Sequence, residues 1–337
     1  MKVIHGGDVW QTGTPGQSLD FSANLNPEGP PEWVRSAMLE GLARAPYYPD
    51  VRSAAAMKGM CAHLNLAQDC LMITAGGIEA AALAASLPGV HVIAQPTFQE
   101  YGRLCGKYRN VDRAECLSRA MAPGETLWVC NPNNPTGHAF SRGAMLELLN
   151  RVEAAGGRLI VDEAFIDYCP EHSICDQVAE HPALIVLGSL TKILAIPGIR
   201  LGYLAAHPDV IRALKEDLIP WRLNCVADAV AGALAEREAD FEAIRALNRR
   251  RRSAFAGALC RLGAKVYPSE ANFLLCDFGR DMRPVIERLR AQHVLLRPCG
   301  MFPGLTHGHV RLCVRREAEN ERLIGLLNDE IQGDRQL

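Results

Sequence analysis

The sequence lacks three features that would mark a membrane, secreted or nucleic-acid-binding protein. No apolar run approaches the ~20 residues that a membrane-spanning helix needs. The first residues, MKVIHGGDVW, contain no apolar segment of the kind found in a signal peptide. Neither sign of charge is in excess, because 36 Lys and Arg residues balance 38 Asp and Glu residues to a net charge of −2. We therefore expect a cytoplasmic protein with no nucleic-acid or membrane partner.

Closely paired cysteines are also missing, although the sequence contains twelve cysteines. No CxxC pair occurs, and the tightest cluster combines Cys169, His172 and Cys175. A structural metal site usually requires about four ligands, so these three residues leave a metal site as the less favoured alternative. We expect reduced thiols, as in a cytoplasmic protein, and no bound metal.

The order of the predicted elements indicates an α/β protein. Apolar strand candidates at 71–74, 91–96, 126–130, 158–165 and 183–189 are separated by segments with helical character, such as 78–87 and 141–157. Such alternation is typical of a parallel sheet with helices on both faces. The length of 337 residues is compatible with two domains. We predict an N-terminal arm over 1–31, a large domain over 32–220 and a small α+β domain over 221–337.

For two of the predicted helices, the sequence also predicts which face is buried or solvated. The helix after Pro31 places Trp33, Met38 and Leu42 on one face, which we expect to be buried. A long helical stretch is predicted over about 225–262, and it contains the charged segment RALNRRRRSAF. We interpret this segment as a solvated helix face, with a nucleic-acid patch as the alternative.

Polar residues follow three of the predicted strands, at 131–137, 162–163 and 189–192. Ligands of open α/β sheets bind at that edge. Lys192 is the candidate for chemistry, because a lysine whose ammonium pKa is depressed forms a Schiff base with carbonyl cofactors. Pyridoxal phosphate sites pair such a lysine with an acid at the pyridine nitrogen, and Asp162 fits that role.

Three motifs together resemble the fold-type I, class I and II aminotransferase superfamily. They are NPNNPTG at 131–137, VDEAF at 161–165 and SLTK…PGIRLGY at 189–203, and the resemblance extends over the whole chain. It implies the fold-type I transferase fold, with a large domain around a mostly parallel sheet that binds pyridoxal 5′-phosphate and a smaller α+β domain. It also implies a homodimer with shared active sites.

The resemblance assigns roles to particular residues. Lys192 corresponds to the Schiff-base lysine, Asp162 to the partner of the pyridine nitrogen, and Asn134 to the donor at the ring 3′ oxygen. Phe98 corresponds to the aromatic residue stacked on the ring, and Phe165 replaces a tyrosine found in many members. The residues expected at the cofactor phosphate are Gly76, Gly77, Ile78, Ser189, Arg200 and Tyr48 of the partner subunit. Free amides at a helix N-terminus bind anions, which agrees with the first three.

Further segments resemble one branch of the superfamily, the threonine-phosphate decarboxylases of cobalamin biosynthesis. These segments are HGGD at 5–8, DFSANLNPEGPP at 20–31 and LLRPCGMFPGLTHGHVRLCVR at 295–315. The implied reaction is decarboxylation of L-threonine O-3-phosphate to (R)-1-aminopropan-2-ol phosphate. The substrate contacts implied by the resemblance are His5, Asn24, Asn134, Arg297 and Arg311. Forked guanidinium donors suit a phosphate dianion.

Three alternatives remain open. One is an aminotransferase acting on a phosphorylated amine such as histidinol phosphate, a close relative within the superfamily. Another is decarboxylation of phosphoserine, since one methyl group accounts for only ~1–3 kcal/mol of discrimination. The third is a regulator that binds the cofactor without catalysis. Decarboxylation and transamination differ in which bond at Cα stands perpendicular to the cofactor ring, a feature that no motif encodes.

Overall fold

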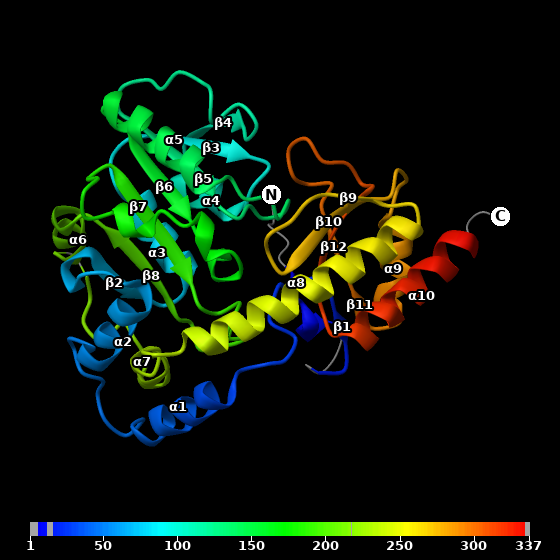
Figure 1. The fold of residues 1–337 in the computed structure, drawn as a ribbon, viewed down its shortest axis with the longest axis horizontal. Helices are drawn as coiled ribbons and strands as arrows, with labels where there is room; N and C mark the ends of the chain where they lie inside the picture. The colour runs from blue at the N-terminus through cyan, green and yellow to red at the C-terminus, as the bar shows by residue number, and fades with distance from the viewer. Residues whose placement is uncertain (1–5, 12–15, 217, 334–337) are drawn as a thin grey trace.

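A seven-stranded sheet forms the centre of the first unit of the computed structural model, which describes residues 6–11, 16–216 and 218–333 (Figure 1). The strands lie in the order β2 (Leu71–Thr74), β8 (Gly202–Ala206), β7 (Leu184–Ser189), β6 (Arg158–Asp162), β5 (Glu125–Cys130), β3 (Val90–Gln95) and β4 (Tyr108–Asp112). Only β8 is antiparallel to its neighbours. The carboxyl ends of the other six strands therefore share one edge, and the predicted α/β fold with a mostly parallel sheet is confirmed.

Helices cover both faces of this sheet because its strands are apolar on both sides. Side chains of successive strand residues point to opposite faces. In β6, Leu159 and Val161 accordingly join one buried cluster, whereas Ile160 joins another. The first cluster includes side chains of α1 (Glu32–Ala43), α2 (Ala54–Leu64), α5 (Arg142–Ala154) and α7 (Cys225–Gly232). The second includes side chains of α3 (Gly77–Ala85), α4 (Glu100–Cys105) and α6 (Pro208–Lys215).

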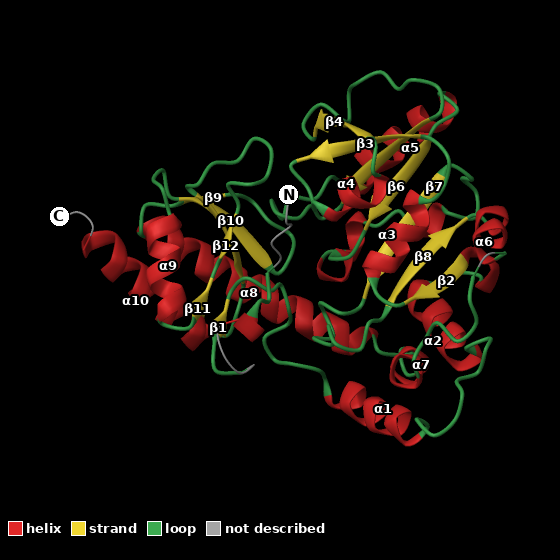
Figure 2. Cartoon of the chain, turned by 180° about the vertical axis from the view of Figure 1, so that it is seen from behind, coloured by secondary structure: helices red, strands yellow, loops and turns green. Residues whose placement is uncertain are grey.

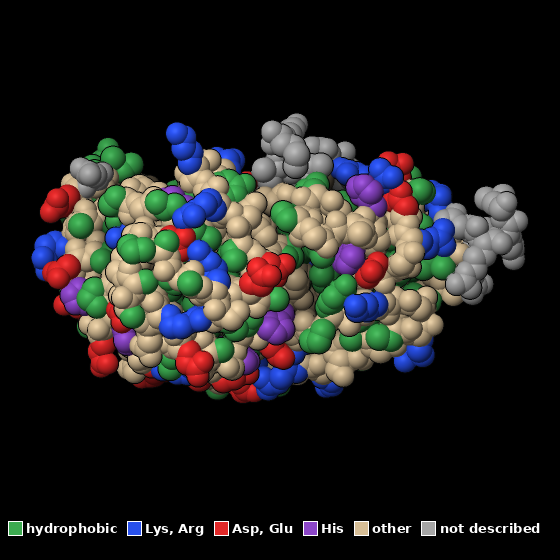
Figure 3. Space-filling view, turned by 90° about the horizontal axis from the view of Figure 1, so that it is seen from above, with side chains coloured by type: hydrophobic (Ala, Val, Ile, Leu, Met, Phe, Trp, Pro, Cys, Tyr) green, Lys and Arg blue, Asp and Glu red, His purple; other side chains and the backbone are tan. Residues whose placement is uncertain are grey.

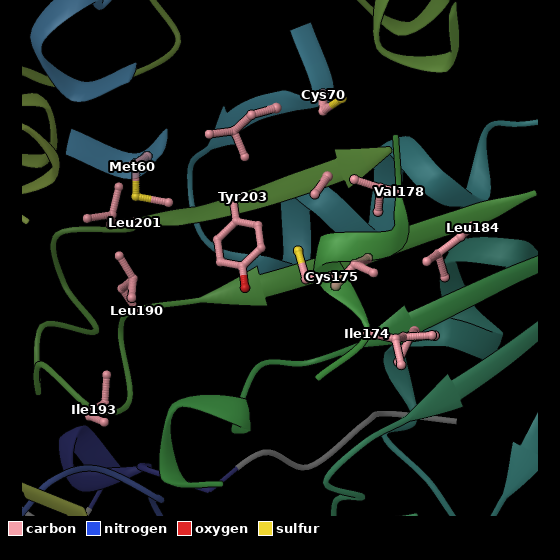
Figure 4. Close-up of a cluster of buried hydrophobic side chains, with 14 of the residues drawn as sticks. Met60, Cys70, Ile174, Cys175, Val178, Leu184, Leu190, Ile193, Leu201 and Tyr203 are labelled. Carbon is pink, nitrogen blue, oxygen red and sulfur yellow. The ribbon is translucent and has the colours of Figure 1, made fainter. Parts of the chain in front are cut away.

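Tyr203 marks a tightly packed point of the first cluster. Figure 4 shows its ring extending from β8 among the side chains of Met60, Leu201 and Cys175. A Cβ atom on Gly188 of the neighbouring strand would lie 2.0 Å from Cζ of Tyr203. The strand that leads to Lys192 is therefore locked against its neighbour by an aromatic ring.

A second unit is built on a four-stranded antiparallel sheet. Its order is β12 (Arg297–Pro298), β13 (His309–Cys313), β10 (Phe273–Asp277) and β9 (Lys265–Val266), with α9 (Arg283–Ala291) and α10 (Glu317–Gly333) alongside. β1 (Leu19–Asp20) of the predicted arm pairs in parallel with β11 (Val294–Leu295), and Phe21 is fully buried in this core. Figure 2 shows α10 and the C-terminus at the end of this unit farthest from the large sheet.

One long helix, α8 (Glu238–Arg261), links the two units, as Figure 1 shows. Phe241 near its start belongs to the core of the first unit, whereas Phe255 and Leu259 belong to the core of the second. We propose that the boundary between the units lies within α8 and that residues 19–21 belong to the small unit. The expectation of one helical stretch over 225–262 was wrong, because α7 and α8 are separated by a turn in which Glu236 has φ +62°.

The charged segment of α8 is only partly a solvated face. Arg245 is buried and donates to Glu242 at 2.8 Å and to Glu238. Arg251 donates to Glu317 of α10 at 2.8 Å and to Glu28 at 2.6 Å, which ties α8 to two distant segments. On the face shown in Figure 3, Lys and Arg side chains alternate with Asp and Glu side chains.

The first predicted helix is present as α1, and two residues of its expected apolar face, Trp33 and Met38, are partly buried against the core, whereas Leu42 is not. Val34, Ala37 and Gly41 are buried against α7, whereas Leu42 is 60% exposed. The buried positions are small because α1 and α7 approach closely. The remaining elements are short 3-10 turns: η1 (Val9–Gln11), η2 (Gln68–Cys70), η3 (Ile166–Tyr168), η4 (Pro170–His172) and η5 (Cys175–Gln177).

Two findings concern the described segments as a whole. They contain no helix with the length and apolar character to span a bilayer. All twelve cysteines lie within these segments, and each has a free thiol.

Gly59 provides a test of the close approach between α2 and α7. A Cβ atom there would lie 2.1 Å from the Ala231 carbonyl oxygen, so we expect Gly59→Ala to lower the free energy of unfolding by about 1–3 kcal/mol. Gly143→Ala is the matched control, because this glycine of α5 is exposed and has nothing near its Cβ position. The control should be neutral or slightly stabilising. Thermal melting of both variants checks the packing, and equal melting temperatures would contradict it.

Candidate active site

A cavity of about 850 Å³ lies where the carboxyl edge of the large sheet meets the small unit. Most of the residues expected from the sequence line it: Asn24, Gly77, Ile78, Phe98, Asn134, Asp162, Ser189, Lys192, Arg200, Arg297 and Arg311. The large sheet supplies the ends of β5, β6 and β7, the segment after β3 supplies Phe98, and the small sheet supplies β12 and β13. The cavity therefore exists only when both units are in place.

Lys192 follows β7 and is partly buried at the wall of the cavity. Burial lowers the pKa of its ammonium group to about 8, and the neighbouring cations Arg311 and Arg200 act in the same direction. Asp162 opposes this shift. At pH 7 about a tenth of the Lys192 side chain is consequently the neutral amine, far more than for a lysine with an ordinary pKa, and this is the form that attacks a carbonyl.

Asp162 is the last residue of β6 and is held at both carboxylate oxygens. Oδ1 accepts the Ala164 amide at 2.9 Å, and Oδ2 accepts the hydroxyl of Tyr101. Burial raises the pKa of this carboxyl group, whereas the two hydrogen bonds and Lys192 lower it. The carboxyl group of Asp162 is thus held in one position inside the cavity, and the charge of Lys192 lowers its pKa.

The N-terminus of α3 forms an anion-binding corner beside Lys192. Gly76 precedes the helix with φ +84° and has no side chain to cap the first amides, which lack acceptors within the helix. A Cβ atom on Gly76 would lie 2.5 Å from Nη2 of Arg200, so glycine is required for the guanidinium to approach. The hydroxyls of Ser189 and Thr191 lie 2.8 Å apart at the same corner. These donors suit a phosphate group.

The turn that carries Asn134 is fixed by its neighbours. Asn131 accepts the Phe140 amide at 2.7 Å, and Asn133 donates to the Pro96 carbonyl at 2.9 Å. Oδ1 of Asn134 itself accepts Nη1 of Arg311 at 2.5 Å. The contact joins the large unit to the small unit across the cavity.

Arg297 and Arg311 face each other in register on β12 and β13. Nη2 of Arg311 donates to the Ser22 carbonyl at 2.5 Å, and neither arginine pairs with an Asp or Glu among the described residues. Nη1 of Arg297 and Nε of Arg311 are buried without a partner. Burial lowers the pKa of Arg311 to about 10, with Arg297 contributing. Two neighbouring buried cations with free donors form a site for an anion.

Two of four further predicted residues lie at the cavity, and the other two are not seen there. Phe98 lines the cavity, and Asn24 is buried there with Oδ1 unpaired. Tyr48 does not line the cavity of its own chain: it is 84% exposed, and its ring centre lies 5.0 Å from that of Trp221. His5 lies outside the residues that the structure describes.

Several lining residues were not predicted from the sequence. They are Tyr101, Gln99 and Phe302, together with the Ser22 carbonyl that holds Arg311. Tyr101 had a detectable signal, because it lies only three residues after Phe98, which was itself expected at the cofactor. The others reach the cavity through contacts between segments far apart in the sequence.

The residues present fit pyridoxal 5′-phosphate. They provide an amine with a lowered pKa, a buried acid and an anion-binding helix N-terminus in one cavity. No cluster of His, Cys, Asp and Glu side chains within the described segments is arranged to hold a metal ion.

Comparison with known proteins places this geometry in a family. The model of aminotransferase class I and II matches residues 19–327, so the chain belongs to this family. It is a pyridoxal-phosphate-dependent enzyme. The chain is 33% identical to the threonine-phosphate decarboxylase of Salmonella typhimurium, over 98% of this chain and 97% of that protein. It is 31% identical to a histidinol-phosphate aminotransferase of Symbiobacterium thermophilum, over 92% and 89%.

Solved structures confirm the fold. The L-threonine-O-3-phosphate decarboxylase of Porphyromonas gingivalis aligns with a TM-score of 0.85 at 24% identity, covering 93% of this chain and 99% of that one. The histidinol-phosphate aminotransferase of Sinorhizobium meliloti, solved with pyridoxal 5′-phosphate, aligns with a TM-score of 0.82 at 19% identity, covering 92% and 90%.

The lowered pKa of Lys192 can be tested on the apoprotein. Only the neutral amine attacks the cofactor aldehyde, so a pKa of about 8 predicts that capture accelerates about tenfold from pH 7 to pH 9 and then levels off. A lysine with an ordinary pKa would continue to accelerate beyond pH 10. Stopped-flow absorbance after mixing apoprotein with pyridoxal 5′-phosphate measures the rate. Lys58→Ala, which changes an exposed lysine, should leave the profile unchanged, and Lys192→Ala should abolish capture.

Proposed function

We propose that the enzyme decarboxylates L-threonine O-3-phosphate to (R)-1-aminopropan-2-ol phosphate, a reaction of cobalamin biosynthesis. The observation that carries the proposal is the pair of buried arginines, Arg297 and Arg311, which face the cavity without a carboxylate partner among the described residues. The cofactor phosphate has its own corner at α3 and Arg200, so this second cationic site is available for an anionic group of the substrate. The Salmonella typhimurium relative supports the choice of substrate.

The cofactor, when bound, supplies an aldehyde for condensation with amines and a ring that accepts electrons released at the substrate Cα. Lys192 would provide the amine that holds the cofactor. Asp162 would hold a proton at the ring nitrogen, which would increase the electron-accepting capacity of the ring. Arg297, Arg311 and Asn24 would bind the substrate's anionic groups and thereby orient the bonds at Cα. Phe98 would provide an apolar contact for the ring.

Decarboxylation and transamination use the same residues up to the orientation of Cα. A clamp on the phosphate that turns the carboxylate out of the plane of the ring favours loss of carbon dioxide. The similarity to histidinol-phosphate aminotransferases makes transamination the second candidate, and phosphoserine remains a second substrate. Carbon dioxide release from phosphothreonine without any keto acid supports the proposal. Turnover of histidinol phosphate that requires 2-oxoglutarate, with no carbon dioxide, would replace it.

We further propose a homodimer that shares its active sites. Large apolar side chains are exposed in two segments, one from α1 into the loop that follows it and one around residues 219–221. The two segments are in contact, because the rings of Tyr48 and Trp221 pack together. The exposed side chains are Leu39, Leu42, Tyr47, Tyr48, Val51, Ile219 and Trp221, with exposed fractions of 50–84%. An apolar surface of this extent is characteristic of a protein interface. In such a dimer, Tyr48 would reach the partner's cofactor phosphate. We also propose that the protein is cytoplasmic.

Arg297→Met tests the substrate-phosphate site. The change removes the charge but keeps an apolar side chain, and it should lower kcat/KM for phosphothreonine about ten- to a hundredfold. This range corresponds to the loss of about 1.5–3 kcal/mol for a hydrogen bond to a charged group. The weak turnover of unphosphorylated threonine should change little. Arg252→Met is the control, because this arginine pairs with Glu270 away from the cavity. Equal losses on both substrates would show that Arg297 supports the fold or the cofactor.

The proposed interface is tested by Leu39→Asp on α1. Burying a carboxylate at an apolar interface is costly, so sedimentation should show the wild type as a dimer and the variant as a monomer that retains the cofactor less well. Val90→Asp is the control, because Val90 is an exposed apolar residue of β3 outside the surface defined above. If the variant stays dimeric, the interface does not include Leu39 and the proposed surface is wrong.

A further inference from the structure

Tyr101 is the buried group closest to the cofactor acid. It lies on α4, its side chain is only 1% exposed, and its hydroxyl donates to Oδ2 of Asp162. The other carboxylate oxygen is already occupied by the Ala164 amide at 2.9 Å. Each oxygen of the acid therefore has its own donor, one from the chain that follows β6 and one from a helix about sixty residues earlier in the sequence.

The Tyr101 ring is held by aromatic neighbours on two sides. It stacks on Trp128, with ring centres 5.2 Å apart and planes inclined by 29°, and Phe98 meets it edge-on with centres 5.5 Å apart. Trp128 is in turn fixed, because its Nε1 donates to Nδ1 of His91 at 3.1 Å. Such aromatic contacts leave the ring little freedom. The position of the hydroxyl is accordingly set by the core of the large unit.

The surroundings keep Tyr101 a donor. Burial and the adjacent Asp162 raise the pKa of the phenol well above its usual value, so it remains protonated. Burial likewise raises the pKa of the neighbouring Cys130 thiol to about 12. Lys192 is the cation that faces Asp162 from the loop after β7. The carboxylate thus has two fixed neutral donors and one cationic neighbour.

We propose that Tyr101 is a positioning residue that keeps Asp162 ionised and oriented, so that the proton between Asp162 and the cofactor's ring nitrogen stays on the nitrogen. A hydrogen bond donated to a carboxylate favours its charged form and lowers its proton affinity. Without the phenol, burial would favour the protonated acid, and the ring nitrogen would lose its proton. The inference applies to decarboxylation and transamination alike, so it stands or falls separately from the proposed reaction.

The test compares wild type with Tyr101→Phe, which removes one oxygen and keeps the stacked ring. Each protein is loaded with pyridoxal 5′-phosphate labelled with ¹⁵N at the ring, and the nitrogen chemical shift reports its protonation. We expect the shift to move toward the value of neutral pyridine, with Asp162→Asn giving the limiting value. The kcat should fall about ten- to a hundredfold, the range for one hydrogen bond to a charged group, while KM changes little.

Two further variants separate positioning from general damage. Tyr168→Phe removes a buried hydroxyl that lies outside the cavity, so its nitrogen shift should match wild type. Tyr101→Phe combined with Asp162→Asn should behave as Asp162→Asn alone, because the phenol acts through the acid. An unchanged nitrogen shift in Tyr101→Phe, or additive losses in the double variant, would overturn the proposal.

A second measurement covers the case in which Tyr101→Phe does not fold. Wild type and Asp162→Asn are labelled with ¹³C at Cζ of the seven tyrosines. A phenol that donates to a carboxylate differs in Cζ shift from one that faces an amide, so one of the seven resonances should move between the two proteins. Seven unchanged resonances would refute the contact on which the inference depends.

Discussion

The active site depends on the gathering of four positively charged side chains and two carboxylates around one cavity. Lys192, Arg200, Arg297 and Arg311 line it together with Asp162 and Asp20. Loss of water and repulsion lower the pKa values of Lys192 and Arg311, to about 8 and about 10. Bound anions relieve this repulsion, so the cavity favours ligands that carry phosphate and carboxylate groups. The same electrostatic constraint lowers the pKa of Lys192 and so increases the share of its side chain that is a free amine at neutral pH.

The fold gathers these groups from both units. The ends of β3, β5, β6 and β7 share one edge because these strands run in one direction, and the antiparallel β8 begins at that same edge, just after Arg200. The small unit adds Arg297 and Arg311 from adjacent strands. Bonds from Arg311 to Asn134 and to the Ser22 carbonyl join the large sheet, the N-terminal segment and the small sheet. Movement of one unit against the other would therefore alter substrate binding before it altered the cofactor corner.

Second-layer contacts give the site its precision. Asp162 is fixed by an amide of its own segment and by Tyr101, which is itself packed against Trp128. Gly76 has no side chain and so lets Arg200 approach the start of α3. These neighbours hold the reacting groups in place without touching the substrate, which is how preorganised sites limit the rearrangement needed during reaction.

Much of this protein could be predicted from the sequence. Alternating apolar strands and helices gave the α/β fold, and the positions of Lys192 and Asp162 after their strands gave the cofactor chemistry, because strand ends at one edge converge whatever the details of packing. The exposure of Leu42 on α1 could not be predicted, since close approach to α7 gives the most buried positions to Val34, Ala37 and Gly41. The buried state of Arg245 and the contact of Tyr101 with Asp162 were decided by tertiary structure alone. Each depends on segments distant in the sequence, whose spacing in the folded chain no local pattern records.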